Sequence, residues 1–201
     1  MAQAKTLTND QLNTVLKYVE KRSKQPVRDY VIVLLSFKAG LRAAEIAGLD
    51  WDDVTDAFGN IGQPGENGAM FLTIPADIAK KGHTRTVPMH NALRAALIAL
   101  KGTTPAYLTK GSDPVVRGSI VPRMSANNLQ QYVGRLYRSM GLQGCSSHSG
   151  RRSFITAAAR AANNYGCSLK DVQRIAGHKY IDTTERYVDP STQVAMLVGA
   201  L

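Results

Sequence analysis

Six side chains in four separated segments of this chain could together act on a phosphodiester. They are two arginines, a lysine, two histidines and a tyrosine: Arg42, Lys80, His148, Arg151, His178 and Tyr187. Phosphoryl transfer needs cations directed at the non-bridging oxygens, because the negative charge of the transition state is spread over them. Arginine suits this task because its planar guanidinium binds two oxygens at once and keeps its charge. The tyrosine hydroxyl would then be the nucleophile.

The same set needs neither a metal ion nor an organic cofactor. The sequence shows no acidic cluster arranged to hold Mg²⁺, which argues against a metal-dependent nuclease. Cys145 and His148 form a lone pair at a metal-ligand spacing, which indicates zinc only weakly. A covalent tyrosine intermediate would keep the bond energy, so rejoining would need no nucleotide. We therefore expect no metal and no cofactor.

The charge distribution indicates a polyanionic partner. The formal net charge is +10, and residues 101–201 hold 13 Lys or Arg against 5 Asp or Glu. Such a basic half is typical of proteins that bind nucleic acid or a membrane surface. The sequence contains no run of about 18 apolar residues that could span a membrane. Its first residues lack the apolar core of a signal peptide, so we expect a cytoplasmic protein that binds nucleic acid and no membrane.

Local patterns predict an α+β chain that is mainly helical, with a small antiparallel β-sheet or hairpin. Thr8-Asn-Asp-Gln11 is typical of a capping box, and Pro26 and Ser125 are typical of helix starts. Apolar periodicity and glycine stops indicate the other helices. The predicted helices span residues 8–22, 26–38, 91–100, 125–140, 149–162 and 168–177, and a short helix from Asp182 carries Tyr187 in its second turn.

Two segments, Met70–Ile74 and Thr84–Met89, are predicted to be the strands of the hairpin. The connection between them turns at Gly82 and carries Lys80. The other connections are predicted as loops, namely the glycine-rich residues 55–69 and residues 102–124, with a short strand near Tyr107 as an option.

At these residues the chain resembles the tyrosine recombinase (phage integrase) family. Four signatures carry the resemblance. They are Lys38–Trp51 with its arginine, Lys80 eight residues before Pro88, the box His148-Ser-Gly-Arg151, and Gly177-His178 followed nine residues later by Tyr187. Each signature alone is weak, but their shared order and spacing make the set specific. The resemblance runs from about Thr6 to Asp189.

The resemblance implies a role for each of the six side chains. Arg42 and Arg151 would bind the scissile phosphate, and both histidines would add hydrogen bonds. Tyr187 would attack the phosphorus, forming a 3′-phosphotyrosine and freeing a 5′-hydroxyl that Lys80 protonates as general acid. The ordinary pKa of tyrosine is about 10, so a nearby base, expected to be His148, would accept its proton.

Two assignments have close rivals. Lys81 adjoins Lys80, and only one of the two should reach the site because neighbouring strand residues point to opposite faces. Counting back from Pro88 favours Lys80. Tyr180 is the only tyrosine close to Tyr187, but its spacing does not fit the signature. Tyr180 and the remaining tyrosines are expected to be packing residues: Tyr18, Tyr30, Tyr107, Tyr132, Tyr137 and Tyr165.

Neighbouring residues are expected to support the site or the DNA. Glu45 should make a structural contact near Arg42. Gly150 stands where the family usually has leucine, and this change should alter helix packing. Arg152 stands where histidine is frequent and should face away from the site. The candidate contacts to the DNA backbone are Lys81, Arg152, Arg174, Lys179 and Arg186.

We expect residues 1–201 to form a single catalytic domain. The resemblance begins almost at Thr6, which implies a short form without the N-terminal core-binding domain, or a piece of a longer protein. Residues 190–201 would be a C-terminal tail that docks either on a neighbouring protomer or on its own domain. On double-stranded DNA we expect a homo-oligomer, in the form of a tetrameric synapse. A monomer in solution is an alternative that the sequence leaves open.

The expected function is a site-specific DNA recombinase of the integrase or excisionase type, from a prokaryotic cell, a phage or another mobile element. Two alternatives share parts of the pattern. A type IB topoisomerase-like strand transferase would use the same chemistry to relax supercoils. A non-catalytic or accessory DNA-binding regulator would keep the DNA contacts without an assembled site.

Overall fold

The computed structural model describes residues 4–80, 82–118 and 121–187. The helices are α1 (Asn9–Arg22), α2 (Pro26–Lys38), α3 (Ala43–Gly48), α4 (Trp51–Val54), α5 (Asn91–Thr103), α6 (Ala126–Ser139), α7 (Ser149–Ala161), α8 (Leu169–Ala176) and α9 (Asp182–Glu185), with the 3₁₀ turns η1 (Glu66–Gly68), η2 (Ala106–Leu108) and η3 (Ala162–Tyr165). The strands are β1 (Gln63–Pro64), β2 (Met70–Ile74) and β3 (Arg85–Pro88). The predicted mainly helical α+β class is confirmed.

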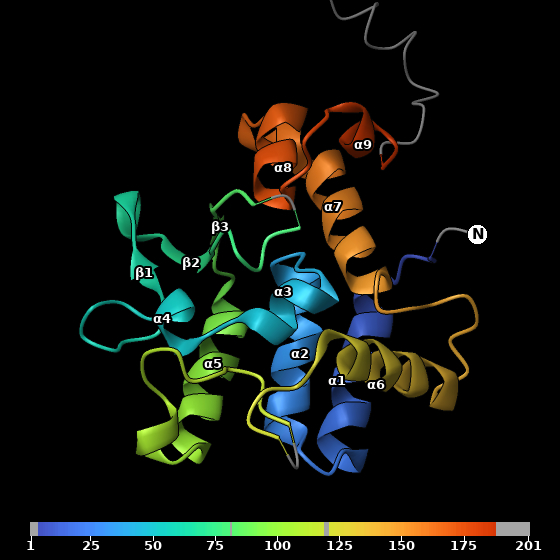
Figure 1. Ribbon diagram of the computed structural model, residues 1–201. Helices are drawn as coiled ribbons and strands as arrows, with labels where there is room; N and C mark the ends of the chain where they lie inside the picture. The colour runs from blue at the N-terminus through green and yellow to red at the C-terminus, as the bar shows by residue number, and fades with distance from the viewer. Residues whose placement is uncertain (1–3, 81, 119–120, 188–201) are drawn as a thin grey trace, which may run out of the picture.

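The main core is built around α2, which lies between α1 and α5 (Figure 1). Every residue of α2 from Val31 to Phe37 is buried, because this helix is apolar on nearly all sides. Helices α1, α3, α5 and α7 contact it from different directions. The capping box predicted for α1 is present, with the Gln11 amide donating to Thr8 Oγ1 at 3.2 Å and the Thr8 amide donating to Gln11 Oε1 at 2.9 Å.

The small sheet is antiparallel throughout, in the order β1-β2-β3. Strand β2 pairs with β3 in a register that sets Leu72 opposite Val87 and Ile74 opposite Arg85. Leu72, Ile74 and Val87 are fully buried and hold the hairpin on the main core. Strand β1 falls within residues 55–69, which were predicted to be a loop or hairpin tip. The connection from β2 to β3 carries Lys80, as predicted.

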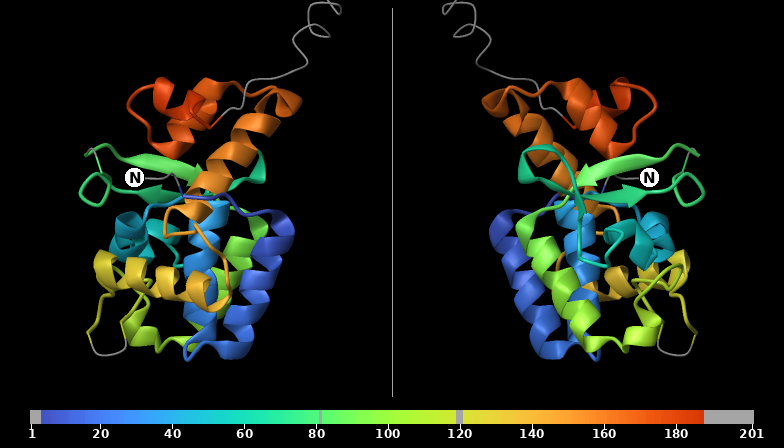
Figure 2. Two further views of the ribbon diagram at one scale, coloured as in Figure 1. Left: turned by 90° about the vertical axis from the view of Figure 1, so that its right-hand side faces the viewer. Right: turned by 90° about the vertical axis from the view of Figure 1, so that its left-hand side faces the viewer.

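Helices α7, α8 and α9 form a second part of the molecule; in Figure 1, α8 and α9 lie above the sheet and α7 runs from the main core up to them. Figure 2 shows the β2–β3 hairpin between α8 and the main core, and α8 contacts β3. Helix α8 starts with a capping box of Ser168 and Asp171 and ends at Gly177, whose φ of 63° lies in the left-handed region. A separate apolar cluster holds this part together: Ile155, Ala162, Val172 and Ala176, with Tyr187 packed against it.

The close approach of α7 to α2 depends on Gly150. A Cβ at this position would overlap Ser36 Oγ and lie 2.8 Å from Phe37 Cδ2. A leucine side chain at position 150 would not fit between the two helices as they now pack. The expected change of helix packing is therefore a tighter contact at the start of α7, next to Arg151.

Several sequence predictions need correction. The optional strand near Tyr107 is wrong, because Ala106–Leu108 form the 3₁₀ turn η2, in which the Leu108 amide donates to Pro105 O at 2.8 Å. Helix α9 has four residues, so Tyr187 lies beyond its end rather than in a second helical turn. Three tyrosines predicted to pack are exposed instead: Tyr107, Tyr165 and Tyr180. The tail 190–201 lies outside the described residues.

Candidate active site

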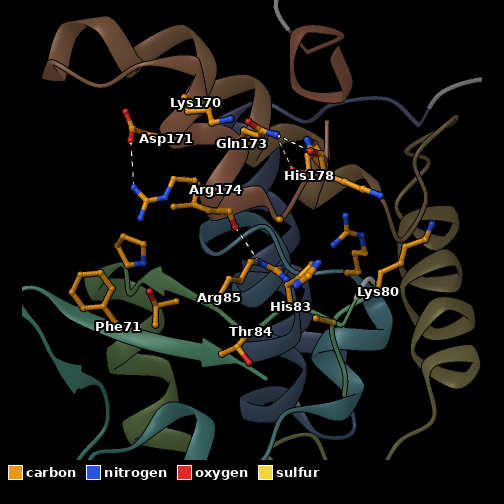
Figure 3. Close-up of a pocket in the computed structure, with 17 residues that line it drawn as sticks. Phe71, Lys80, His83, Thr84, Arg85, Lys170, Asp171, Gln173, Arg174 and His178 are labelled. Atoms are coloured by element: carbon orange, nitrogen blue, oxygen red, sulfur yellow. Dashed lines mark hydrogen bonds and ion pairs between the residues drawn. The ribbon is translucent and has the colours of Figure 1, made fainter. Parts of the chain in front are cut away.

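A positively charged groove separates the β2–β3 hairpin from α8 (Figure 3). Its volume is about 660 Å³. The described residues that line it include six Lys or Arg side chains against one carboxylate, Asp171. The six are Arg42, Lys80, Arg85, Lys170, Arg174 and Lys179, and His178 lies at the same groove. A cleft lined by cations concentrates polyanions, so this hairpin–α8 groove is the candidate site.

Arg42 is held at the groove by a buried carboxylate. It is the N-cap residue of α3, and its Nη1 contacts Glu45 Oε1 at 2.8 Å while its amide donates to Glu45 Oε2 at 2.8 Å. The Glu45 side chain is fully buried. Burial alone would raise its pKa, but the hydrogen bonds and charges of Arg85 and Arg42 hold the pKa of Glu45 below its ordinary value. The predicted contact between Glu45 and Arg42 is therefore confirmed.

Arg85 on β3 is a site residue that the sequence reasoning missed. Its Nη1 and Nη2 donate to the two carboxylate oxygens of Glu45 at 2.9 and 2.8 Å, and its Nε donates to Ile175 O at 3.2 Å. A sequence signal was available, because Arg85 and the fully buried Val87 share one face of the strand. A charge on a buried face needs a partner, and Glu45 is a carboxylate on the buried side of α3.

Arg151 is buried at the start of α7 and joined to two other segments. Its Nη1 donates to Gly40 O at 2.6 Å, and its Nη2 donates to Ala176 O at 2.5 Å. A guanidinium has five N–H donors, so donors remain for a phosphate. Burial and then the neighbouring Arg42 lower the pKa of Arg151 to about 9. The guanidinium therefore stays charged at pH 7.

His148 precedes α7, close to three cations of the predicted set. Partial desolvation lowers the pKa of its ring, and Arg151, Lys80 and Arg42 lower it further, in that order. A histidine whose pKa lies below 6.5 is mainly neutral at pH 7 and can accept a proton.

His178 and Tyr187 face each other at the end of the described chain. Their rings stack with centroids 5.8 Å apart and planes inclined by 24°. Nδ1 of His178 lies 2.9 Å from Oγ1 of the buried Thr184. The Gln173 side chain donates to His178 O at 3.0 Å and fixes the turn after α8. The two residues of the final signature are therefore adjacent in space.

The residues predicted to contact the DNA backbone lie in different parts of the structure. Arg152, expected to face away, is half-buried and its guanidinium lies 5.7 Å from the Tyr187 ring centroid, because α7 packs beside the chain that follows α9. Arg174 and Lys179 are exposed and line the hairpin–α8 groove. Arg186 is exposed but lies outside the groove lining. Lys81 falls outside the described residues. Lys170 lines the groove without having been predicted.

In residues 4–80, 82–118 and 121–187, no three His, Cys, Asp or Glu side chains gather in an arrangement that could hold a metal ion. Within the same part of the chain, no helix is long and apolar enough to cross a bilayer.

The fold is that of tyrosine recombinase catalytic domains. The Tn1549 transposon integrase, in complex with a circular intermediate DNA, superposes with a TM-score of 0.73 at 19% identity, covering 100% of this chain and 67% of the integrase chain. The XerA recombinase superposes with a TM-score of 0.71 at 19% identity, covering 100% of this chain and 65% of XerA. At such identities the likeness concerns the fold.

The chain belongs to the phage integrase family, whose model matches residues 5–193. It is similar to tyrosine recombinase XerC of Brucella suis biovar 1 (strain 1330), with 27% identity over 193 residues, 94% of this chain and 56% of XerC. It is also similar to tyrosine recombinase XerA of Pyrococcus furiosus, with 26% identity over 186 residues, 91% of this chain and 56% of XerA. The chain spans about half the length of these relatives.

Proposed function

We propose that this chain is the catalytic part of a site-specific DNA recombinase that cleaves and rejoins strands through a 3′-phosphotyrosine intermediate. One observation carries the proposal. Segments far apart in the sequence converge: Arg42, Lys80 and His178 line one groove. Arg151 donates to Ala176 O, two residues before His178, and the His178 ring stacks on Tyr187. Family membership supports it. So does the structural neighbour XerH, a site-specific recombinase bound to its difH DNA, with a TM-score of 0.72.

The guanidinium groups of Arg42 and Arg151 are preorganised to bind a phosphate. Glu45 orients Arg42, and two backbone carbonyls orient Arg151. Their remaining N–H groups bind the non-bridging oxygens of the scissile phosphate, and His148 and His178 add hydrogen bonds. Donors that are already fixed stabilise the developing charge without a cost of reorganisation during the reaction.

The proton transfers follow from the same arrangement. The Tyr187 hydroxyl attacks the phosphorus, and its proton passes to the neutral His148 ring. The bond from phosphorus to the 5′ oxygen breaks, and Lys80 donates a proton to that oxygen. The product is a 3′-phosphotyrosine with a free 5′-hydroxyl. Attack by a 5′-hydroxyl of another strand reverses these steps, so rejoining uses no nucleotide cofactor.

The hairpin–α8 groove supports double-stranded DNA as the substrate, because its cations complement the negative charge of a phosphate backbone, which is independent of base sequence. Its exposed cations include Arg174 and Lys179, which are proposed to contact the backbone. We also propose that the active species on DNA is a homo-oligomer. The tail, residues 190–201, is proposed to mediate contacts between protomers, and sedimentation of a chain shortened after Asp189 tests this role.

A nicked suicide substrate tests the proposed function directly, because loss of a short fragment traps the covalent adduct. The wild-type chain should form an adduct that survives denaturation, and Tyr187→Phe should form none while still binding DNA. Tyr180→Phe is the matched control, since Tyr180 is an exposed tyrosine of the same segment, and it should keep the adduct. DNA binding by the wild type without any adduct would instead support an accessory DNA-binding protein.

A further inference from the structure

One buried side chain touches two of the segments that carry the proposed catalytic residues and belongs to a third. Arg85 lies on β3, in the hairpin that also carries Lys80. Its fork holds both oxygens of Glu45, the carboxylate that orients Arg42. Its Nε donates to Ile175 O, in the last turn of α8 and just before His178. The Arg85 side chain is only 10% exposed, so these contacts are shielded from water.

The contact with α8 is tight as well as polar. Gly177 ends α8 directly over Arg85, and a Cβ at this glycine would lie 3.0 Å from Cδ, Nε and Cζ of Arg85. The last carbonyls of a helix lack partners within the helix and carry its negative dipole end, which favours a cation. Arg85 and Arg151 satisfy two successive carbonyls there, Ile175 O and Ala176 O. The C-terminal end of α8 is thus held by hydrogen bonds from two guanidinium groups.

We propose that Arg85 is a positioning residue for strand cleavage, which sets the distance between Arg42 on α3 and the His178–Tyr187 segment after α8. This inference rests on the proposed function. Arg85 does not contact the reacting atoms; it acts through Glu45 and through the end of α8. A lysine cannot replace it fully, because one ammonium cannot bind both carboxylate oxygens and a carbonyl in that fixed fork geometry.

The test compares Arg85→Met and Arg85→Lys in the full chain. Single-turnover adduct formation on the nicked substrate is measured at saturating enzyme, alongside DNA affinity and thermal unfolding. Misplacing a catalytic group by about 1 Å costs on the order of 10²-fold in rate. We expect a loss of that order for Arg85→Met and roughly a tenfold loss for Arg85→Lys, with DNA affinity changed by less than about threefold because the exposed groove cations remain.

Arg123 offers a matched control. It also joins a carboxylate to helix-end carbonyls, with Nη2 2.5 Å from Asp50 Oδ1 and Nη1 2.8 Å from Gly48 O, but at the far end of α3. Arg123→Met and Arg123→Lys should lower the unfolding temperature without slowing adduct formation at temperatures where the chain is folded. If Arg85→Met does not fold, the rates of adduct formation by Arg85→Lys and Arg123→Lys are compared instead, and this comparison decides whether Arg85 has the positioning role.

A substrate with sulfur at the 5′ bridging position separates positioning from proton delivery, because a thiolate leaves without being protonated. This substrate should restore cleavage by Lys80→Ala but not by the Arg85 variants. Rescue of the Arg85 variants, or rates equal to those of the Arg123 variants, would overturn the positioning role while leaving the proposed function intact. If the wild type forms no Tyr187 adduct at all, the proposed function itself fails.

Discussion

Replacing Glu45 by glutamine should destabilise the fold far more than a single isosteric change on the surface. The Glu45 carboxylate is fully buried and accepts four hydrogen bonds, one from the Arg42 amide and three from the guanidinium groups of Arg42 and Arg85. In Glu45→Gln the amide NH₂ would face guanidinium N–H groups, donor against donor. Two partly buried cations, Arg42 and Arg85, would then lack their counter-charge.

The size of the effect follows from this arrangement. Removing one partner of a buried ion pair costs about 3–5 kcal/mol, because the remaining charge stays buried without compensation. In a chain of this size each kcal/mol shifts the melting temperature by about 2–4 °C. Glu45→Gln should therefore lower the melting temperature by roughly 6–20 °C near pH 7.

The pH dependence gives a second check on the same variant. The pKa of Glu45 in the folded protein is held below its ordinary value of 4.5. Its contribution to stability is then complete above about pH 4.5 and is lost as the pH falls through the folded-state pKa. The difference in melting temperature between wild type and Glu45→Gln should be constant from pH 5 to 8 and should narrow below pH 4.5.

Thermal unfolding followed by circular dichroism at a series of pH values provides the measurement. Asp171→Asn is the control, because the pKa of Asp171 is also lowered, by hydrogen bonds from Ser168, although this carboxylate is at an exposed helix cap. Its melting temperature should change much less. A Glu45→Gln variant that melts within about 2 °C of the wild type at pH 7 would refute the reasoning.

Three other outcomes are expected. The rate of adduct formation should fall only below pH 6.5, because the lowered pKa of His148 keeps the proposed base neutral above that value; a rate that already declines between pH 8 and 7 contradicts this assignment. Gly150→Leu should cost about 1–3 kcal/mol in denaturant unfolding, because its side chain would overlap Ser36 and Phe37; unchanged stability would show that α7 can move away from α2. If 6–10 phosphates are neutralised, DNA affinity should fall by about 10³–10⁵ between 50 and 200 mM salt, and a flat response in a filter-binding assay would exclude the phosphate-driven mode.

Local signals predicted most of the secondary structure because they act over a few residues. The capping box of Thr8 and Gln11 starts α1, and the left-handed Gly177 ends α8. The periodic apolar face of α1 is buried as predicted. Strand β1 was missed because it has only two residues, paired with β2 through a loop whose pattern is dominated by glycine. Its pairing depends on a partner strand and not on its own sequence.

The sequence pointed to the candidate catalytic residues, but it did not predict the groups that anchor them. The signatures pointed to Arg42, Arg151 and Tyr187, whereas the anchoring of Arg151 on Gly40 O and Ala176 O depends on backbone atoms, which no residue type specifies. Arg152 was placed on the outer side of α7 from helix geometry alone. Its actual neighbour, the Tyr187 ring, comes from a segment that packs there only in the folded chain.

The sequence by itself determined which chemical groups are present, in which order, and on which local elements they lie. Residue types and spacings over a few positions are enough for that, because capping, periodicity and side-chain chemistry are local properties. Only the tertiary structure decided that Arg85 and Glu45 join the hairpin, α3 and the end of α8. Glu45 and Arg85 are 40 positions apart, and the attraction between their charges becomes strong only when the packing of three elements excludes water from the pair.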